Sequence, residues 1–209
     1  MLIPIESYLS FFAASVVLAL APGPDNIFVL TQSAMHGRRA GLLVTLGLCT
    51  GLLVHTAAVV VGVAAIFQAS ALAFNALKFA GAAYLLYLAW GAWRAGASRI
   101  EARDGASPQG WRLYRRGIVM NVTNPKVSVF FLAFLPQFAD PKHGSLALQL
   151  ISLGGGFLFA TLLVFGSVAL LAGSIGRWLA QSRRAQVVIN RTAALIFAGL
   201  ALRLATAQR

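Results

Sequence analysis

Six long apolar stretches, separated by short polar connections, organise the 209-residue chain. Each is long enough to cross the ~30 Å hydrocarbon core of a bilayer, which takes about 20 residues of α-helix. Because the stretches are apolar throughout rather than at alternate positions, they predict helices and not the strands of a barrel. The pattern therefore predicts an all-α fold, a polytopic membrane helix bundle of about six transmembrane helices in one domain over residues 1–209. The stretches run approximately over residues 8–35, 41–67, 72–93, 117–138, 146–173 and 185–205.

A polar linker over about residues 95–112 divides the chain into half-repeats of three predicted spans each, 1–94 and 113–209. Because three is odd, related halves would lie in opposite orientations, as in many secondary transporters. The first span of each half is also interrupted by prolines and polar residues, in the segments PGPDN (22–26) and NPK (124–126). We therefore predict two inverted repeats with discontinuous first helices, a pattern that indicates a binding site at the interruptions.

Composition supports a membrane protein. Hydrophobic residues make up 59% of the chain and charged residues 11%, and the mean hydropathy is +0.79. Soluble domains carry about 25% charged residues, so this chain has too few to cover a water-facing surface. The single cysteine, Cys49, lies in an apolar stretch and excludes a disulfide framework.

The net charge of +12 arises from basic residues that cluster in the connections between spans. Twelve of the 17 Lys and Arg residues fall on one side of a six-span topology, so the positive-inside rule predicts cytoplasmic connections there, including the linker, and periplasmic termini. This distribution is typical of an orientation signal and not of nucleic-acid binding. Lys142, Arg203 and Arg209 fall on the other side. The twelve are Arg38, Arg39, Arg94, Arg99, Arg103, Arg112, Arg115, Arg116, Arg177, Arg183, Arg184 and Arg191.

Three ionisable residues, Asp25, Lys126 and His55, fall near the centre of the predicted spans. Asp25 precedes Arg38 by 13 residues, about 20 Å of helix. A charge at that depth costs a few kcal/mol, which favours a functional role. Simpler interpretations stay open: Asp25 as a helix cap, Lys126 as a side chain extending to the interface, and His55 as a hydrogen-bonded core residue.

Opposite charges at the two interruptions suit an amino-acid zwitterion. Asp25 would bind the ammonium group and Lys126 the carboxylate, with Asn26, Asn124 and His55 as further candidate substrate-binding residues. A basic amino acid would need a second intramembrane acid, which favours neutral substrates. The sequence has no phosphate-binding GxxxxGK[ST] loop, so we expect no cofactor and the proton gradient as the energy source.

Other function classes have weaker support in the sequence. An enzyme is not expected, because neither HExxH nor GxSxG occurs. No metal site is expected from three scattered histidines and one cysteine. The alternatives kept open are an exporter of a basic amino acid or a metal ion with the same membrane fold, and a membrane scaffold without transport activity.

Two glycines and a set of aromatic residues carry structural predictions. Gly47 and Gly51 form a GxxxG step that predicts close contact between helices. Aromatic residues at helical spacing before Arg94 predict an interfacial belt at that end of their span. The belt residues are Tyr84, Tyr87, Trp90 and Trp93.

The chain resembles the LysE/RhtB family of bacterial amino-acid exporters. The resemblance is carried by APGPDNIFVLTQSAMHGRRAG (21–41), LKFAGAAYLLYLAWGAWR (77–94), RRGIVMNVTNPKVSVFFLAFLPQF (115–138) and the Gly47/Gly51/His55 pattern. It implies proton-driven export of amino acids such as homoserine, threonine or leucine through the bacterial inner membrane. We expect an amino acid and membrane lipid as partners, with a homodimer as an open alternative. The signature positions that the resemblance implies are Pro22, Gly23, Pro24, Asp25, Asn124, Pro125 and Lys126.

Overall fold

A computed structural model describes residues 2–21, 23–69, 71–95, 109–171 and 182–206, and every element in these ranges is a helix. The side chains of residues 63–69, 71–74, 77 and 183 are outside the description. So are most of the predicted linker and the residues Pro22, Arg99, Arg103, Arg177 and Arg209.

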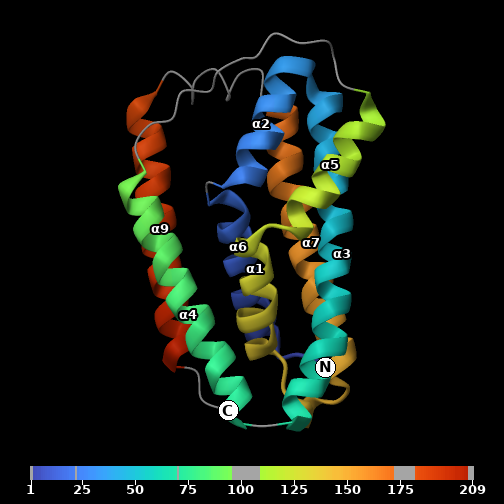
Figure 1. Cartoon of the computed structure of the whole chain (residues 1–209), viewed down its shortest axis with the longest axis vertical. Coiled ribbons are helices and arrows are strands. Elements are labelled where there is room, and N and C mark those ends of the chain that lie inside the picture. Colours follow the sequence, from blue (N-terminus) through green and yellow to red (C-terminus); the bar gives the residue numbers. More distant parts are fainter. Residues whose placement is uncertain (1, 22, 70, 96–108, 172–181, 207–209) are drawn as a thin grey trace.

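Four long helices run along the bundle (Figure 1). They are α3 (Arg38–Ala69), α4 (Ala71–Arg94), α7 (Leu146–Leu171) and α9 (Arg183–Thr206). Helix α3 packs against α7, and α4 packs against α9. These four elements coincide with four predicted spans to within about three residues, since the apolar stretches set the length of helix that can be buried or face lipid.

The other two predicted spans are bent pairs of helices. Helix α1 (Ile5–Leu20) continues as α2 (Pro24–His36) after a bend of 59°. Helix α5 (Gly110–Val122) continues, after a bend of 48°, as α6 (Pro125–Val129), then as the π-helical turn η1 (Phe130–Phe134) and the 3-10 turn η2 (Leu135–Phe138). A further 3-10 turn, η3 (Pro141–His143), leads to α7.

Three helices in the described part of the chain are long and apolar enough to cross a membrane, or up to five spans if each bent pair counts as one. The three lie within Arg38–Gly62, Leu146–Leu171 and Arg184–Thr206. The chain is therefore a multi-pass membrane protein. The remaining predicted span, 72–93, lies in α4, whose side chains are described only in part, so six spans stay a prediction.

The two bent pairs meet head to head in the middle of the bundle. Helix α1 begins, and α9 ends, at the same end of the molecule, the lower end in Figure 1. From the middle, α2 runs toward the upper end and α6 toward the lower end. The N-termini of α2 and α6 therefore both lie in the middle of the bundle. The unpaired N–H groups of a helix N-terminus carry partial positive charge.

Two apolar clusters form the core, one above the other along the bundle. The lower cluster contains Phe11, Leu52, Phe130 and Phe157, and the upper cluster contains Phe28, Val29, Leu48 and Val164. Along α3 the change from one cluster to the other comes between Leu48 and Leu52, and along α7 between Phe157 and Val164. The buried polar side chains described below lie at this boundary.

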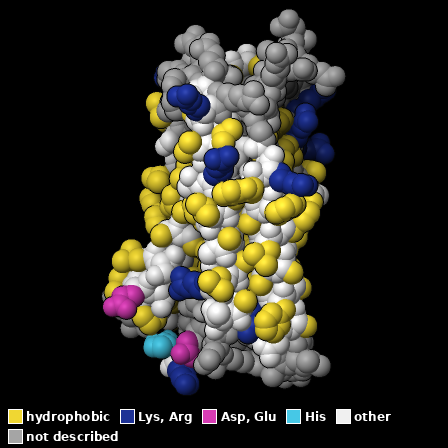
Figure 2. All heavy atoms as spheres, turned by 90° about the vertical axis from the view of Figure 1, so that its left-hand side faces the viewer, with side chains coloured by type: hydrophobic (Ala, Val, Ile, Leu, Met, Phe, Trp, Pro, Cys, Tyr) yellow, Lys and Arg dark blue, Asp and Glu magenta, His cyan; other side chains and the backbone are white. Residues whose placement is uncertain are grey.

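The outer surface fits a lipid environment with polar ends. Hydrophobic side chains cover the middle of the face in Figure 2, Lys and Arg gather toward the upper end, and the acidic side chains on view lie at the lower end. Trp90, Trp93 and Trp111 are more than half exposed, and Arg94 and Arg191 lie over the rings of Trp90 and Trp93. This arrangement agrees with the predicted aromatic belt.

Glycines allow α3 and α5 to touch through their backbones. A Cβ atom on Gly47 would lie 3.0 Å from the Gly117 Cα atom and closer still to the Tyr114 carbonyl oxygen. A Cβ atom on Gly51 would lie 2.7 Å from the Cβ atom of Asn121. The prediction of close helix contact at the GxxxG step is confirmed, and it brings Asn121 to the centre of the bundle.

Candidate functional site

The end of α1 is bound by a lysine from the other half of the chain. The Leu18 carbonyl lacks its usual partner because the residue four positions later, Pro22, has no N–H. Instead the Lys126 Nζ atom donates to the Leu18 oxygen at 3.2 Å and to the Ala21 oxygen at 3.0 Å. Gly23 gives it room, since a Cβ there would lie 3.1 Å from Nζ. The cation thus meets the negative end of the α1 dipole.

At the end of α5, too, a proline leaves a carbonyl without its usual helical partner. The Asn121 carbonyl would pair with the N–H of residue 125, which is a proline. It lies 3.1 Å from His55 Nε2 and accepts from the Asn124 N–H at 3.0 Å. The Asn124 side chain then caps α6, because its Oδ1 accepts from the Lys126 N–H at 3.0 Å. Each proline therefore frees a carbonyl that a buried nitrogen-bearing side chain binds.

Both half-helices start with the same arrangement of residues. In GPD (23–25) and NPK (124–126) the first residue is the N-cap, proline is the first helical residue and a charged residue is the second. Asp25 lies at a helix N-terminus, which favours its negative charge. The Lys126 charge would be unfavourable there, and its side chain instead reaches the C-terminal end of α1.

Asp25 and Lys126 are both buried but do not pair with each other. Asp25 is 2% exposed and Lys126 is 7% exposed, and no ion pair within 4.0 Å joins them in the described structure. The Asp25 Oδ2 atom accepts from Asn121 Nδ2 at 3.4 Å. Lys126 and His55 lie within electrostatic range of the Asp25 carboxylate. Two opposite charges are thus buried near each other in the middle of the bundle without forming an ion pair.

Four buried polar atoms around the two interruptions have no hydrogen-bond partner within 3.5 Å among the described residues, although the Asn124 side chain lies close enough to interact with the Asp25 carboxylate. They are Asp25 Oδ1, Asn26 Oδ1, Asn121 Oδ1 and Asn124 Nδ2. A buried polar atom without a partner costs about 1–3 kcal/mol, so such atoms are rare and call for an explanation. Their concentration at one level, beside two charges, suits a polar ligand that offers both donors and acceptors.

The predicted candidates Asp25, Asn26, Asn124, Lys126 and His55 all lie around these interruptions. Asn26 also binds α1, because its Nδ2 atom donates to the Ala19 oxygen at 2.6 Å. Of the simpler interpretations, the Asp25 carboxylate accepts no capping hydrogen bond from a described backbone N–H, and Lys126 does not extend to the interface. His55 is a hydrogen-bonded core residue, with its ring also 5.5 Å from that of Phe131.

Asn121 was not among the predicted residues, although it contacts both Asp25 and His55. Its signal in the sequence was present: a polar side chain in an apolar stretch, four residues before Pro125. Among the described residues, no group of three His, Cys, Asp or Glu side chains could hold a metal ion.

Comparison with known proteins places these motifs in context. The model of the LysE type translocator family matches residues 16–208. A homoserine/homoserine lactone efflux protein of Salmonella typhimurium is 40% identical over 175 residues, which cover 83% of this chain and 84% of that protein. A leucine efflux protein of Klebsiella pneumoniae is 29% identical over 206 residues, or 97% and 96% of the two chains. An uncharacterized membrane protein of Vibrio cholerae is 32% identical over 98% of each. No solved structure matches the chain.

Proposed function

The chain belongs to the LysE type translocator family, whose members are transporters rather than enzymes, and we propose that it exports neutral amino acids across the bacterial inner membrane. Relatives named for efflux of homoserine and of leucine support this substrate class. These two amino acids differ in the polarity of their side chains but share an ammonium group, a carboxylate and no further charge.

The observation that carries the proposal is the unpaired state of Asp25 and Lys126. A buried charge that lacks a close counter-charge is costly, and here one of each sign lies in the same layer without an ion pair in the described structure. A zwitterion between them would place its ammonium group at the Asp25 carboxylate and its carboxylate at the Lys126 ammonium. The amide groups of Asn26, Asn121 and Asn124 would hydrogen-bond the same ligand.

Proton antiport would supply the energy. Asp25 would bind a proton and the substrate ammonium in turn, while the two halves move relative to each other. Exchange of one entering proton for one leaving zwitterion moves one charge, which at 100 mV yields about 2.3 kcal/mol, or roughly a fifty-fold gradient.

For the topology we propose a single domain of six spans, with α4 as the additional span. The half-repeats 1–94 and 113–209 would be inverted, the linker 95–112 cytoplasmic and both termini periplasmic. The opposed directions of α2 and α6 and the basic side chains at the upper end support this arrangement (Figures 1 and 2).

The proposal is tested with Asp25→Asn in proteoliposomes that carry labelled homoserine or leucine and an imposed pH gradient. We expect proton-coupled efflux to fall at least about 100-fold, since the amide neither carries a negative charge nor exchanges a proton at this site. Asp25→Glu should retain part of the activity. Asp140→Asn, at a half-exposed acid outside the bent pairs, is the matched control and should change efflux less than twofold.

Undiminished proton-coupled efflux by Asp25→Asn would exclude the proposed role of this residue. Vesicles with the wild-type protein, loaded with lysine or with divalent metal ions, test the alternative that the protein exports a basic amino acid or a metal ion. Efflux of either in preference to homoserine and leucine would replace the neutral amino acid as substrate.

A further inference from the structure

Arg203 lies in the last turn of α9, at the lower end of the bundle. The orientation rule gives no reason for a basic residue there, because the basic connections lie at the opposite end. Arg203 is also distant in sequence from both interruptions and has no part in the site described above. Its surroundings supply another explanation.

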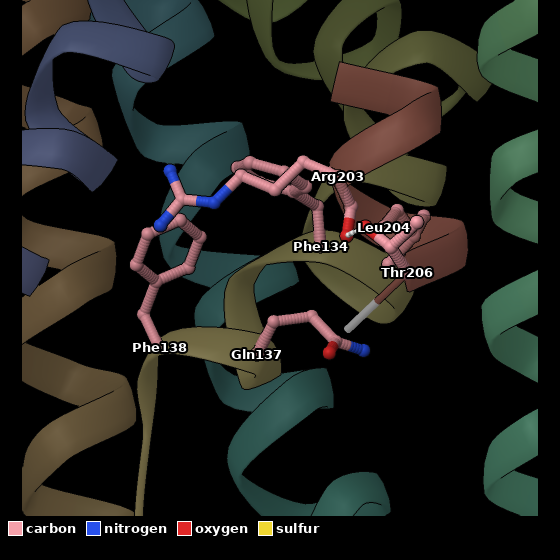
Figure 3. Close-up of a pocket in the computed structure, with 6 residues that line it drawn as sticks. All are labelled: Phe134, Gln137, Phe138, Arg203, Leu204 and Thr206. Carbon is pink, nitrogen blue, oxygen red and sulfur yellow. Dashed lines mark hydrogen bonds between the residues drawn. The ribbon is translucent and has the colours of Figure 1, made fainter. Parts of the chain in front are cut away.

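Arg203 lines a cavity of about 250 Å³ between η2 and the end of α9. In Figure 3 its side chain extends from α9 over the ring of Phe138, while the Gln137 side chain from η2 lies lower, with its amide directed toward Thr206 and away from the guanidinium group. The volume equals that of about eight liquid water molecules at ~30 Å³ each, enough for one small amino acid. The remaining lining residues are Phe134, Leu204 and Thr206.

The guanidinium group of Arg203 is stacked but not paired. Its central carbon lies 4.6 Å from the centroid of the Phe138 ring, and no carboxylate of a described residue lies within 4.0 Å. Stacking occupies the face of the guanidinium plane and leaves its N–H edge free, and this edge matches the two oxygens of a carboxylate. Among the residues that the structure describes, the cavity therefore presents a planar anion-binding group without an acidic partner.

A column of phenylalanines separates Arg203 from Lys126. Phe130, Phe134 and Phe138 follow one another at successive turns after Lys126, with ring centroids 4.8 Å and 5.0 Å apart. Phe130 is 0% and Phe134 1% exposed, so these two rings are packed inside the lower apolar cluster. The column runs through the π-helical turn η1, and such turns often mark functional sites in helices.

We propose that Arg203 forms a second carboxylate-binding subsite, on the exit side of the phenylalanine column. This inference rests on the proposed function: an amino acid leaving Lys126 would pass to Arg203 when the column opens, and from there to the periplasm. Since Phe138 contacts the Arg203 guanidinium, a carboxylate bound to Arg203 would also affect the position of the Phe138 ring. An exposed cation holds a carboxylate more weakly than a buried one, which favours release.

The test measures substrate affinity separately on each side of the membrane. Homoserine exchange is followed in right-side-out vesicles for the external side and in inside-out vesicles for the cytoplasmic side. With Arg203→Gln we expect the half-saturating external concentration to rise at least tenfold and the cytoplasmic one to change less than twofold. Arg203→Lys should fall between, because it keeps the charge and loses the paired N–H edge. Lys142→Gln, an exposed basic residue at the same end but outside the cavity, should change neither value.

An unchanged external value, or an equal rise on both sides, would overturn the subsite, since the first shows no binding and the second a structural role. If wild-type vesicles exchange homoserine but the variants do not differ, the subsite alone is rejected. If wild-type vesicles exchange no amino acid, the proposed function fails and the subsite fails with it.

Discussion

The ammonium group of Lys126 has three N–H donors, and the carbonyl oxygens of Leu18 and Ala21 take two of them. In the proposed function the third donates to the substrate carboxylate. Lys126 therefore stabilises the end of α1 and offers a cation to a ligand in the same position. The functional and the structural interpretation of this residue are compatible, because the carbonyls hold the ammonium in place without neutralising its charge.

Asn121 allows a test of the site that leaves both charges intact. Its amide donates a hydrogen bond to the Asp25 carboxylate at 3.4 Å, and a hydrogen bond to a charged group contributes about 1.5–3 kcal/mol. We expect Asn121→Leu to lower the efflux of homoserine or leucine roughly 10- to 150-fold, measured as initial rates in proteoliposomes at equal protein content.

Thr123→Val is the control for this substitution. Thr123 lies in the same interruption, but its exposed hydroxyl bonds only carbonyls of its own helix, at Val119 and Met120. Efflux should change less than twofold. Equal activity of Asn121→Leu and Thr123→Val would show that the amide at Asn121 does not take part in transport.

At the scale of single residues, depth in the predicted spans was enough to select Asp25, Lys126 and His55, because a titratable group in hydrocarbon is costly wherever it points. Depth could not select Asn121. An uncharged amide in an apolar helix has many structural uses, and its contact with Asp25 depends on the close approach of α5 to α3 at Gly51. That approach is a property of the packed helices.

At the scale of elements, the interruptions were predictable because proline has no N–H and disrupts the helix around it. The type of helix that follows Pro125 was not predictable. Residues 130–138 are rich in phenylalanine and predict an ordinary helix, yet they form the π-helical turn η1 and the 3-10 turn η2. Hydrophobic periodicity does not distinguish these forms over four or five residues, and the ring contacts between Phe130, Phe134 and Phe138 are known only from the packed structure.

Pro125→Ala tests whether the second interruption is needed for transport. Alanine would supply an N–H that can bond the Asn121 carbonyl and would compete with His55 Nε2 for it. Alanine would also remove the cost of about 3 kcal/mol that proline carries inside a helix, so α5 and α6 could join in one continuous helix. We therefore expect efflux to fall at least about tenfold while the midpoint of thermal unfolding in detergent stays equal or rises.

Pro141→Ala, in the exposed turn η3, should leave efflux within twofold of wild type. A Pro125→Ala protein that transports at the wild-type rate would mean that the bend between α5 and α6 has no part in the transport cycle. A lower unfolding midpoint would instead point to a packing role for the proline ring.

At the scale of the whole molecule, the asymmetry of charge organises the bundle. The described basic residues at the start of α3, the end of α4, the start of α5 and the start of α9 lie at its upper end. Arg116 there also contacts α2, with its guanidinium carbon 4.6 Å from the Phe28 ring centroid. The upper end thus carries the basic residues that orient the protein, and one of them, Arg116, also packs α5 against α2.

Cysteine labelling tests the orientation that this asymmetry predicts. The single native cysteine, Cys49, is buried, and Cys49→Ala gives a cysteine-free protein into which single cysteines can be introduced. In it, Gln109→Cys places a thiol beside the basic connection before α5, and Lys142→Cys places one in η3; both positions are exposed. With a membrane-impermeant maleimide on spheroplasts we expect labelling of Lys142→Cys at least about tenfold above that of Gln109→Cys, and equal labelling once the membrane is opened. The reverse pattern would place the Arg-rich end outside, against the positive-inside rule. Arg203 would then face the cytoplasm, and the cavity beside it would admit the substrate instead of releasing it.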